Sequence, residues 1–201
     1  MIRRGAPGAT GGRPHGRGVA GRPLLALAVL GGLLAATGAA LLVASRAPAQ
    51  AADAPARLIP LQPIIDQADP GATVELQPGI YAGSVVIDKP LTLDGGGKAI
   101  IDAQGDGSVL VLKANGATVR HLRVVNSGRS HNSIDAGVQV RGTFNTIEDN
   151  VISDCLFGVD LQQSKYNTVR DNRITSKPVD LGVRGDAVRL WYSFNNTIRS
   201  E

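Results

Sequence analysis

The chain has 201 residues, of which 43% are hydrophobic and 19% are charged, which suits one ordinary globular domain. Its formal net charge is +4, but residues 1–51 contain six arginines and no acid, so the remainder carries 15 lysines and arginines against 17 acids. A weakly acidic domain lacks the clustered cations that phosphate binding needs, which excludes a dedicated nucleic-acid-binding protein. The single cysteine, Cys155, excludes a disulfide within the chain.

Residues 1–51 have the pattern of an export segment. Residues 24–45 are almost wholly apolar, a basic region precedes them, and residues 47–51 offer small side chains for cleavage. Because the apolar run has 22 residues, it is also long enough to remain in a bilayer. We therefore expect either a cleaved signal peptide or an N-terminal membrane anchor, and both place the following domain outside the cytoplasm.

Residues 52–70 are predicted to form a linker and an N-terminal cap. Apolar side chains lie among proline, glutamine and aspartate between Leu58 and Pro70, which indicates a short amphipathic helix. The helix is expected to stop at the turn signal of Asp69, Pro70 and Gly71. Such a helix would cover the unpaired backbone at the start of a stack of strands.

Residues 71–201 contain an internal repeat of short β-branched runs bounded by Gly, Pro, Asn or Asp. Copies occupy residues 137–152, 158–174 and 187–198, and residues 108–124 form a weaker copy. Asn145 and Asn167 are 22 residues apart and Asn167 and Asn196 are 29 apart, so seven extra residues map to an insertion at 177–185, expected to leave the coil as a loop. A period near 22 predicts an all-β fold, a right-handed parallel β-helix of the pectin-lyase type. A leucine-rich repeat would need leucine at fixed positions, which the copies lack.

Alternation within the copies separates inward-facing from outward-facing side chains. The residues expected to stack inside are Val138, Val140, Val159, Leu161, Val188 and Leu190. The outward positions are Gln139, Asp160 and Arg189, and the register should pair Asp160 with Arg189 and Glu148 with Arg170 and Arg199.

Asparagines recur in two registers, Asn145, Asn167 and Asn196 in one and Asn150 and Asn172 in the other. We expect structural ladders that stack along the coils, and the alternative is a polar strip that binds a ligand. The sequence stops within a repeat, so we also expect a truncated β-helix.

Carboxylates and metal ligands are the candidates for chemistry. Four aspartates, Asp135, Asp154, Asp160 and Asp186, do not share a register, so no catalytic residue is predicted, although carbohydrate-cleaving β-helices gather such groups on one face. His121, His131 and Cys155 are the candidate metal ligands. His121 falls at a turn position and Cys155 also suits a small core residue, which leaves His131, in the loop at residues 128–135, as the freest of the three.

Trp191 and Tyr192 form an aromatic pair directly after the insertion, which carries Arg184. These three residues are a candidate contact surface for a partner, since exposed aromatic and arginine side chains are enriched at interfaces. The alternative, which we favour from the sequence, is that the two rings pack against the insertion.

Several motifs resemble a known family. The runs GIY (residues 79–81) and VVIDKPLTLDG (85–95) resemble the opening of the broad superfamily of carbohydrate-binding and sugar-hydrolase β-helices. More specific are NSG (126–128), IDAGV (134–138), LFGVDL (156–161) and VRGDAVRLW (183–191). In that order they look like the NosD family of nitrous oxide reductase maturation proteins, which are periplasmic copper-binding-type β-helices.

The resemblance implies a non-enzymatic accessory protein that assists assembly of the copper centre of nitrous oxide reductase. Its implied partners are the ATPase and permease subunits of an ABC transporter, a copper chaperone and nitrous oxide reductase, and copper is the candidate metal. Two alternatives stay open, a polysaccharide lyase, hydrolase or epimerase and a cell-surface module that binds glycans.

Overall fold

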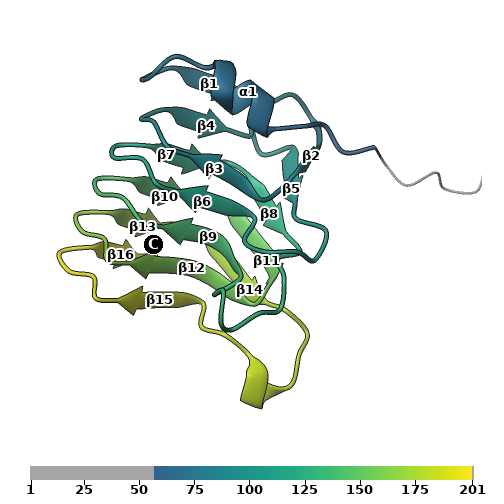
Figure 1. The fold of residues 1–201 in the computed structure, drawn as a ribbon, viewed down its shortest axis with the longest axis vertical. Helices are drawn as coiled ribbons and strands as arrows, with labels where there is room; N and C mark the ends of the chain where they lie inside the picture. The colour runs from purple at the N-terminus through teal and green to yellow at the C-terminus, as the bar shows by residue number, and fades with distance from the viewer. Residues whose placement is uncertain (1–56, 201) are drawn as a thin grey trace, which may run out of the picture. The chain divides into compact units, whose positions relative to one another are not determined.

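The computed structural model describes residues 57–200, so the predicted signal peptide or anchor at 1–51 lies outside the described residues. Within the described range the chain winds into stacked coils, and each regular coil contributes one short strand to each of three parallel sheets (Figure 1). This arrangement confirms the predicted parallel β-helix. No helix in residues 57–200 is long and apolar enough to cross a membrane.

The three sheets follow from the repeat. The first is ordered β1 (Thr73–Glu75), β4 (Thr92–Asp94), β7 (Thr118–Arg120), β10 (Thr146–Glu148), β13 (Thr168–Arg170) and β16 (Thr197–Arg199). The second is ordered β14 (Arg173–Ser176), β11 (Val151–Cys155), β8 (Arg123–Val125), β5 (Ala99–Asp102) and β2 (Gly79–Ala82). The third, called the loop-face sheet below, is ordered β15 (Val188–Trp191), β12 (Phe157–Gln162), β9 (Ala136–Val140), β6 (Leu110–Leu112) and β3 (Val85–Ile87).

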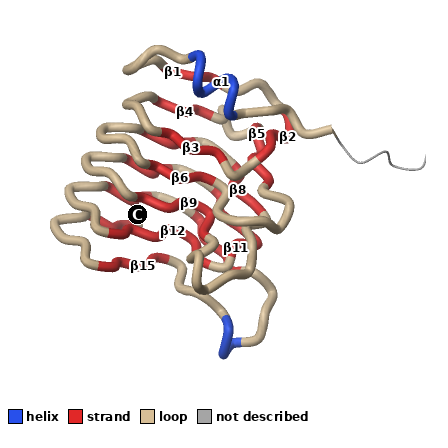
Figure 2. Tube along the Cα trace, in the orientation of Figure 1, coloured by secondary structure: helices blue, strands red, loops and turns tan. Residues whose placement is uncertain are grey.

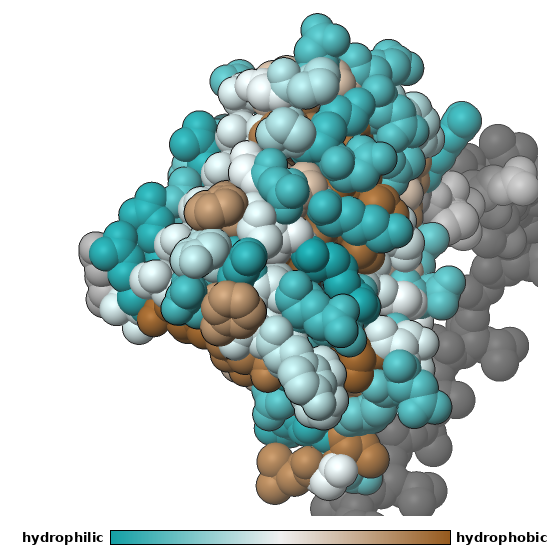
Figure 3. Space-filling view, turned by 60° about the vertical axis from the view of Figure 1, so that its left-hand side comes forward, coloured by the Kyte–Doolittle hydropathy of each residue, from teal (hydrophilic) through white to brown (hydrophobic). Residues whose placement is uncertain are grey.

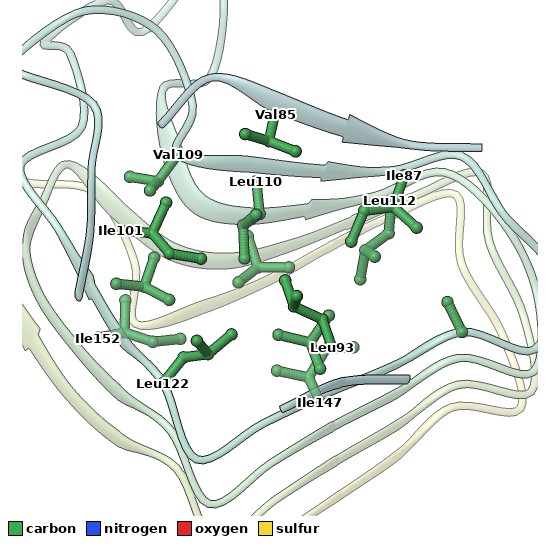
Figure 4. Close-up of a cluster of buried hydrophobic side chains, with 14 of the residues drawn as sticks. Val85, Ile87, Leu93, Ile101, Val109, Leu110, Leu112, Leu122, Ile147 and Ile152 are labelled. Atoms are coloured by element: carbon green, nitrogen blue, oxygen red, sulfur yellow. The ribbon is translucent and has the colours of Figure 1, made fainter. Parts of the chain in front are cut away.

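Apolar side chains from all three sheets point into one interior, as Figure 4 shows for ten labelled residues. Val138, Val140, Val159 and Leu161 are fully buried, as their alternation predicts. Val188 is only half-buried and Leu190 is 46% exposed, although both keep the predicted register with Val159 and Leu161. The difference arises because β15 pairs with β12 alone, so one side of its inner face is left without a neighbouring strand in the described residues.

Helix α1 (Gln62–Gln67) lies at the first coil, within the predicted segment, and Figure 2 shows helix only there and in a loop near the other end. Leu61 and Ile65 are fully buried in the core. The Gln62 side chain bonds both backbone groups of Val86, accepting from its N–H at 2.8 Å and donating to its carbonyl at 3.0 Å. Helix α1 therefore occupies edge hydrogen-bonding groups of β3 that would otherwise be open.

The asparagine registers are structural ladders. In one register the Asn145 side chain accepts from the Ala117 N–H and the Asn167 side chain accepts from the Asn145 N–H, both at 2.8 Å. In the other, Asn150 accepts from the Leu122 N–H at 3.0 Å. Each amide thus satisfies a buried backbone donor of the preceding coil, which favours the structural interpretation over a ligand-binding strip.

Replacing Asn167 by alanine should lower the free energy of unfolding by about 1–3 kcal/mol, because the buried N–H of Asn145 loses its acceptor. Urea unfolding followed by circular dichroism measures the loss. Asn132 is exposed, so Asn132→Ala is the matched control and should be neutral. Equal unfolding midpoints for the two variants would contradict a stabilising ladder.

Candidate functional site

Two loops meet over the beginning of the loop-face sheet. One, residues 126–135, joins β8 to β9, and the other, residues 177–187, joins β14 to β15 and contains the 3₁₀ helix η1 (Leu181–Val183). The second loop is the predicted insertion, and it leaves the stacked coils as expected (Figure 1). Beneath the loops a small apolar cluster, separate from the main core, joins Ala136, Leu156 and Phe157 to the flanking Ile134 and Val179.

His131 connects the two loops. Its Nε2 lies 2.8 Å from the carbonyl oxygen of Val183, so Nε2 carries the proton and donates. The imidazole also contacts Phe157 edge to face, with ring centroids 5.4 Å apart. In this tautomer Nδ1 carries a lone pair and can accept a proton or a metal.

Asp160 and Arg189 form a buried ion pair on the outer side of the same sheet. Asp160 is 0% exposed, and its Oδ1 accepts from Arg189 Nη1 at 2.7 Å, which confirms the predicted pairing. Its other oxygen, Oδ2, is buried and has no hydrogen-bond partner within the described residues. The guanidinium of Arg189 also lies 5.1 Å from the Trp191 ring and 5.9 Å from the Phe157 ring, so cation–π contacts help to position it.

Two of the other three candidate carboxylates have separate structural partners. Asp135 accepts from the Ser130 N–H at 2.7 Å and shapes the first loop, and Asp154 lies 3.1 Å from Lys177 Nζ. Asp186 is exposed in the second loop. Asp135, Asp154 and Asp160 are thus each engaged by a different donor, whereas glycoside hydrolysis uses two carboxyl groups that act on one bond.

His121 takes a left-handed turn conformation, as its register predicts, with φ of 53°. Its Nδ1 lies 3.0 Å from Asp94 Oδ1, and Arg120 holds the other carboxylate oxygen at 2.8 Å. Burial alone would raise the pKa of Asp94, but hydrogen bonds from the Gly96 N–H, His121 and Arg120 together hold it below its usual value. His121 therefore serves a carboxylate-centred turn network.

Cys155 is a core residue, because its side chain is buried and its Sγ contacts the carbonyl oxygen of Ser153 at 3.3 Å. Burial raises the pKa of the thiol to about 11. Since metals bind the thiolate, a thiol that stays protonated at neutral pH is a poor ligand. The structure thus places the three candidate ligands in different surroundings: His121 in a turn, His131 between loops and Cys155 in the core.

The predicted partner surface is exposed. Trp191 and Tyr192 lie edge to face with centroids 5.1 Å apart. Arg184 is also exposed and donates to the Val179 carbonyl within its own loop at 3.2 Å. Sequence reasoning missed three other exposed rings, Phe144, Tyr166 and Phe194, although Phe144 and Tyr166 each directly precede a ladder asparagine and so share a register.

The fold is that of a parallel β-helix in which two long loops, residues 126–135 and 177–187, lie over the beginning of one sheet. A family model described as "Periplasmic copper-binding protein (NosD)" matches residues 96–201, and the chain belongs to this NosD family. A Pseudomonas aeruginosa protein named "Probable ABC transporter binding protein NosD" is 35% identical over 141 residues, covering 69% of this chain and 33% of that protein. A second Pseudomonas aeruginosa relative with the same name is 33% identical over 87 residues, covering 38% of this chain and 80% of the relative.

The alignment thus spans about a third of the length of the first relative. No solved structure matches the chain.

The described residues do not fit a preformed copper site. Copper(I) favours several soft sulfur or imidazole ligands, whereas residues 57–200 contain no methionine, one buried cysteine and two histidines with different partners. Within this range no three His, Cys, Asp or Glu side chains gather closely enough to hold a metal.

Proposed function

We propose that this chain is a non-enzymatic accessory protein that acts outside the cytoplasm in the maturation of nitrous oxide reductase. Membership of the NosD family carries the proposal, together with the export pattern of residues 1–51. The family description names copper, so the cargo of the maturation step is proposed to be copper destined for the reductase.

The proposed partners are the ATPase and permease subunits of an ABC transporter, a copper chaperone and nitrous oxide reductase itself. The names of the two relatives support the transporter association. A parallel β-helix suits such a role, because its stacked coils form a rigid surface on which loops and side chains keep fixed positions.

Within this role the proposed contact residues are Arg184, in the loop before β15, and Trp191 and Tyr192, at the end of β15. If copper touches these coils, His131 is the residue that offers an accessible ring nitrogen. His131 is exposed, whereas Cys155 is buried.

The test is the copper content and activity of nitrous oxide reductase purified from a strain that lacks this gene, with and without complementation by the full reading frame. We expect a copper-deficient, inactive reductase that complementation restores. A fully copper-loaded reductase in the deletion strain would contradict the proposal. Cleavage of acidic or neutral polysaccharides by the purified protein would instead assign a carbohydrate-active enzyme.

A further inference from the structure

The exposed aromatic residues gather at one edge of the coils. Of the seven aromatic residues in the chain, five lie on the three coils nearest the C-terminus, at or beside the turns that join the loop-face sheet to the first sheet. These five side chains are between 44% and 76% exposed. We call Phe144, Tyr166, Trp191, Tyr192 and Phe194 the aromatic edge; Figure 3 turns this side of the molecule toward the viewer.

The rings of the aromatic edge are ordered along the coil axis. Phe144 and Tyr166 occupy equivalent positions of successive coils and stack with centroids 5.0 Å apart and planes 11° apart. The ammonium of Lys165 lies 5.7 Å from the Tyr166 centroid and 5.6 Å from the Phe194 centroid, so one cation bridges two rings. A stack that is internally ordered loses little side-chain freedom on binding.

The charges of these turns all have one sign. On the four coils that follow the first, the turns that join the loop-face sheet to the first sheet are residues 113–117, 141–145, 163–167 and 192–196, and they contain Lys113, Arg141 and Lys165 and no acid. All three cations are exposed, and none forms an ion pair within the described residues. Arg189, by contrast, is neutralised by the buried Asp160. The aromatic edge is therefore flanked by positive charges, although residues 52–201 taken together are weakly acidic.

The orientation of the rings selects the chemistry of the partner. A sugar binds an aromatic side chain through an open ring face, but Phe144 and Tyr166 each cover one face of the other, which reduces the ring-face area available to a sugar. Ring edges carry the positive end of the aromatic quadrupole, so they attract carboxylate and carbonyl oxygens. Cations and ring edges together fit a polypeptide that carries carboxylates between apolar side chains.

We propose that the aromatic edge is a docking surface for an acidic, partly apolar segment of a partner protein. The proposal rests on the proposed function, because it specifies the chemical character of one of the partner proteins. Its test does not depend on reductase maturation. A segment lying along the coil axis would place carboxylates beside Arg141 and Lys165 and apolar side chains on the rings.

The test uses the purified chain and a short fluorescein-labelled peptide of repeating Glu-Leu-Ser units, with Gln-Leu-Ser and Lys-Leu-Ser peptides for comparison. Fluorescence anisotropy should detect binding of the acidic peptide alone, and the affinity should fall as salt is raised. Lys165→Gln should weaken binding about tenfold, since a charge-assisted contact of about 1.4 kcal/mol corresponds to that factor. Lys98→Gln is the matched control, because Lys98 is exposed in the turn between β4 and β5, and it should bind as the native chain does.

The rings are tested by Phe144→Asn with Tyr166→Asn. Both residues have positive φ, 58° and 59°, and asparagine already occupies the equivalent conformation at Asn195, so the double variant should fold. Its binding should fall by at least about tenfold, as expected for interface aromatic residues. The circular dichroism spectrum should stay unchanged.

Four outcomes would overturn the proposal: no binding of the acidic peptide, equal binding of the glutamine peptide, native affinity in the ring variant, or displacement by oligogalacturonate at lower concentration than by unlabelled peptide. The last outcome would make the edge a site for acidic glycans. The deletion-strain experiment tests the maturation role separately, so a failure of one leaves the other standing.

Discussion

Arg189→Met should lower the free energy of unfolding by about 3–5 kcal/mol, the loss typical of removing one partner from a buried ion pair. Asp160 is fully buried and Arg189 holds its Oδ1 at 2.7 Å, so the variant would leave a carboxylate without water or a cation. Urea unfolding at neutral pH, followed by circular dichroism, measures the effect.

Asp160→Asn in the same chain should recover most of that stability, because a neutral amide is cheaper to bury than an unpaired charge. Arg173→Met serves as the control and should change stability little, since Arg173 is exposed and has no ion pair within the described residues. If the single and double variants unfold at the same urea concentration, the pair is not coupled and the expectation is wrong.

Gly142→Val should destabilise the protein by about 3 kcal/mol through overpacking. A Cβ at Gly142 would lie 1.8 Å from the carbonyl oxygen of Ala114 on the neighbouring coil, a distance at which the two backbones must separate. That separation would also disturb the Asn167 ladder, because the Asn167 side chain donates to the Gly142 carbonyl at 3.2 Å. The change in the thermal unfolding midpoint is the measurement.

Gly182→Val provides the comparison for this substitution. Gly182 lies in the exposed insertion, and a Cβ there would meet no atom within 4 Å. The variant should unfold within a few degrees of the native protein, since surface changes away from special features usually cost little. Similar losses at both glycines would contradict a specific close approach at Gly142.

The sequence predicted the β-helix because every stacked coil needs the same kinds of residue at the same positions. Each coil needs apolar side chains at the same inward positions and an asparagine at the same turns, so the pattern recurs at the period of the fold. The pairing of Asp160 with Arg189 follows from the same logic, since residues in one register become neighbours. The exposure of Leu190 was not predictable in this way, because burial of an inward side chain depends on neighbours on both sides of its strand.

The contacts within the candidate site could be predicted from the sequence to a smaller extent than the fold. His131 and Val183 are separated by 52 residues, and no periodicity links two irregular loops, so their hydrogen bond follows only from the folded conformation. Tyr166 and Phe144 share a register, yet the sequence does not say whether rings at a turn stack on one another or fold away from each other. Cys155 was a candidate ligand by residue type, and burial decided its protonation.

By itself, then, the sequence determined the β-helix, its register, its asparagine ladders and the features that indicate the NosD family, because these depend on short-range pattern and repetition. Tertiary structure alone decided which polar groups lose contact with water, which loops touch and which way exposed rings face. Those properties depend on contacts between residues far apart in the chain, and it is these contacts that set the chemistry of the loop-bearing face and the aromatic edge.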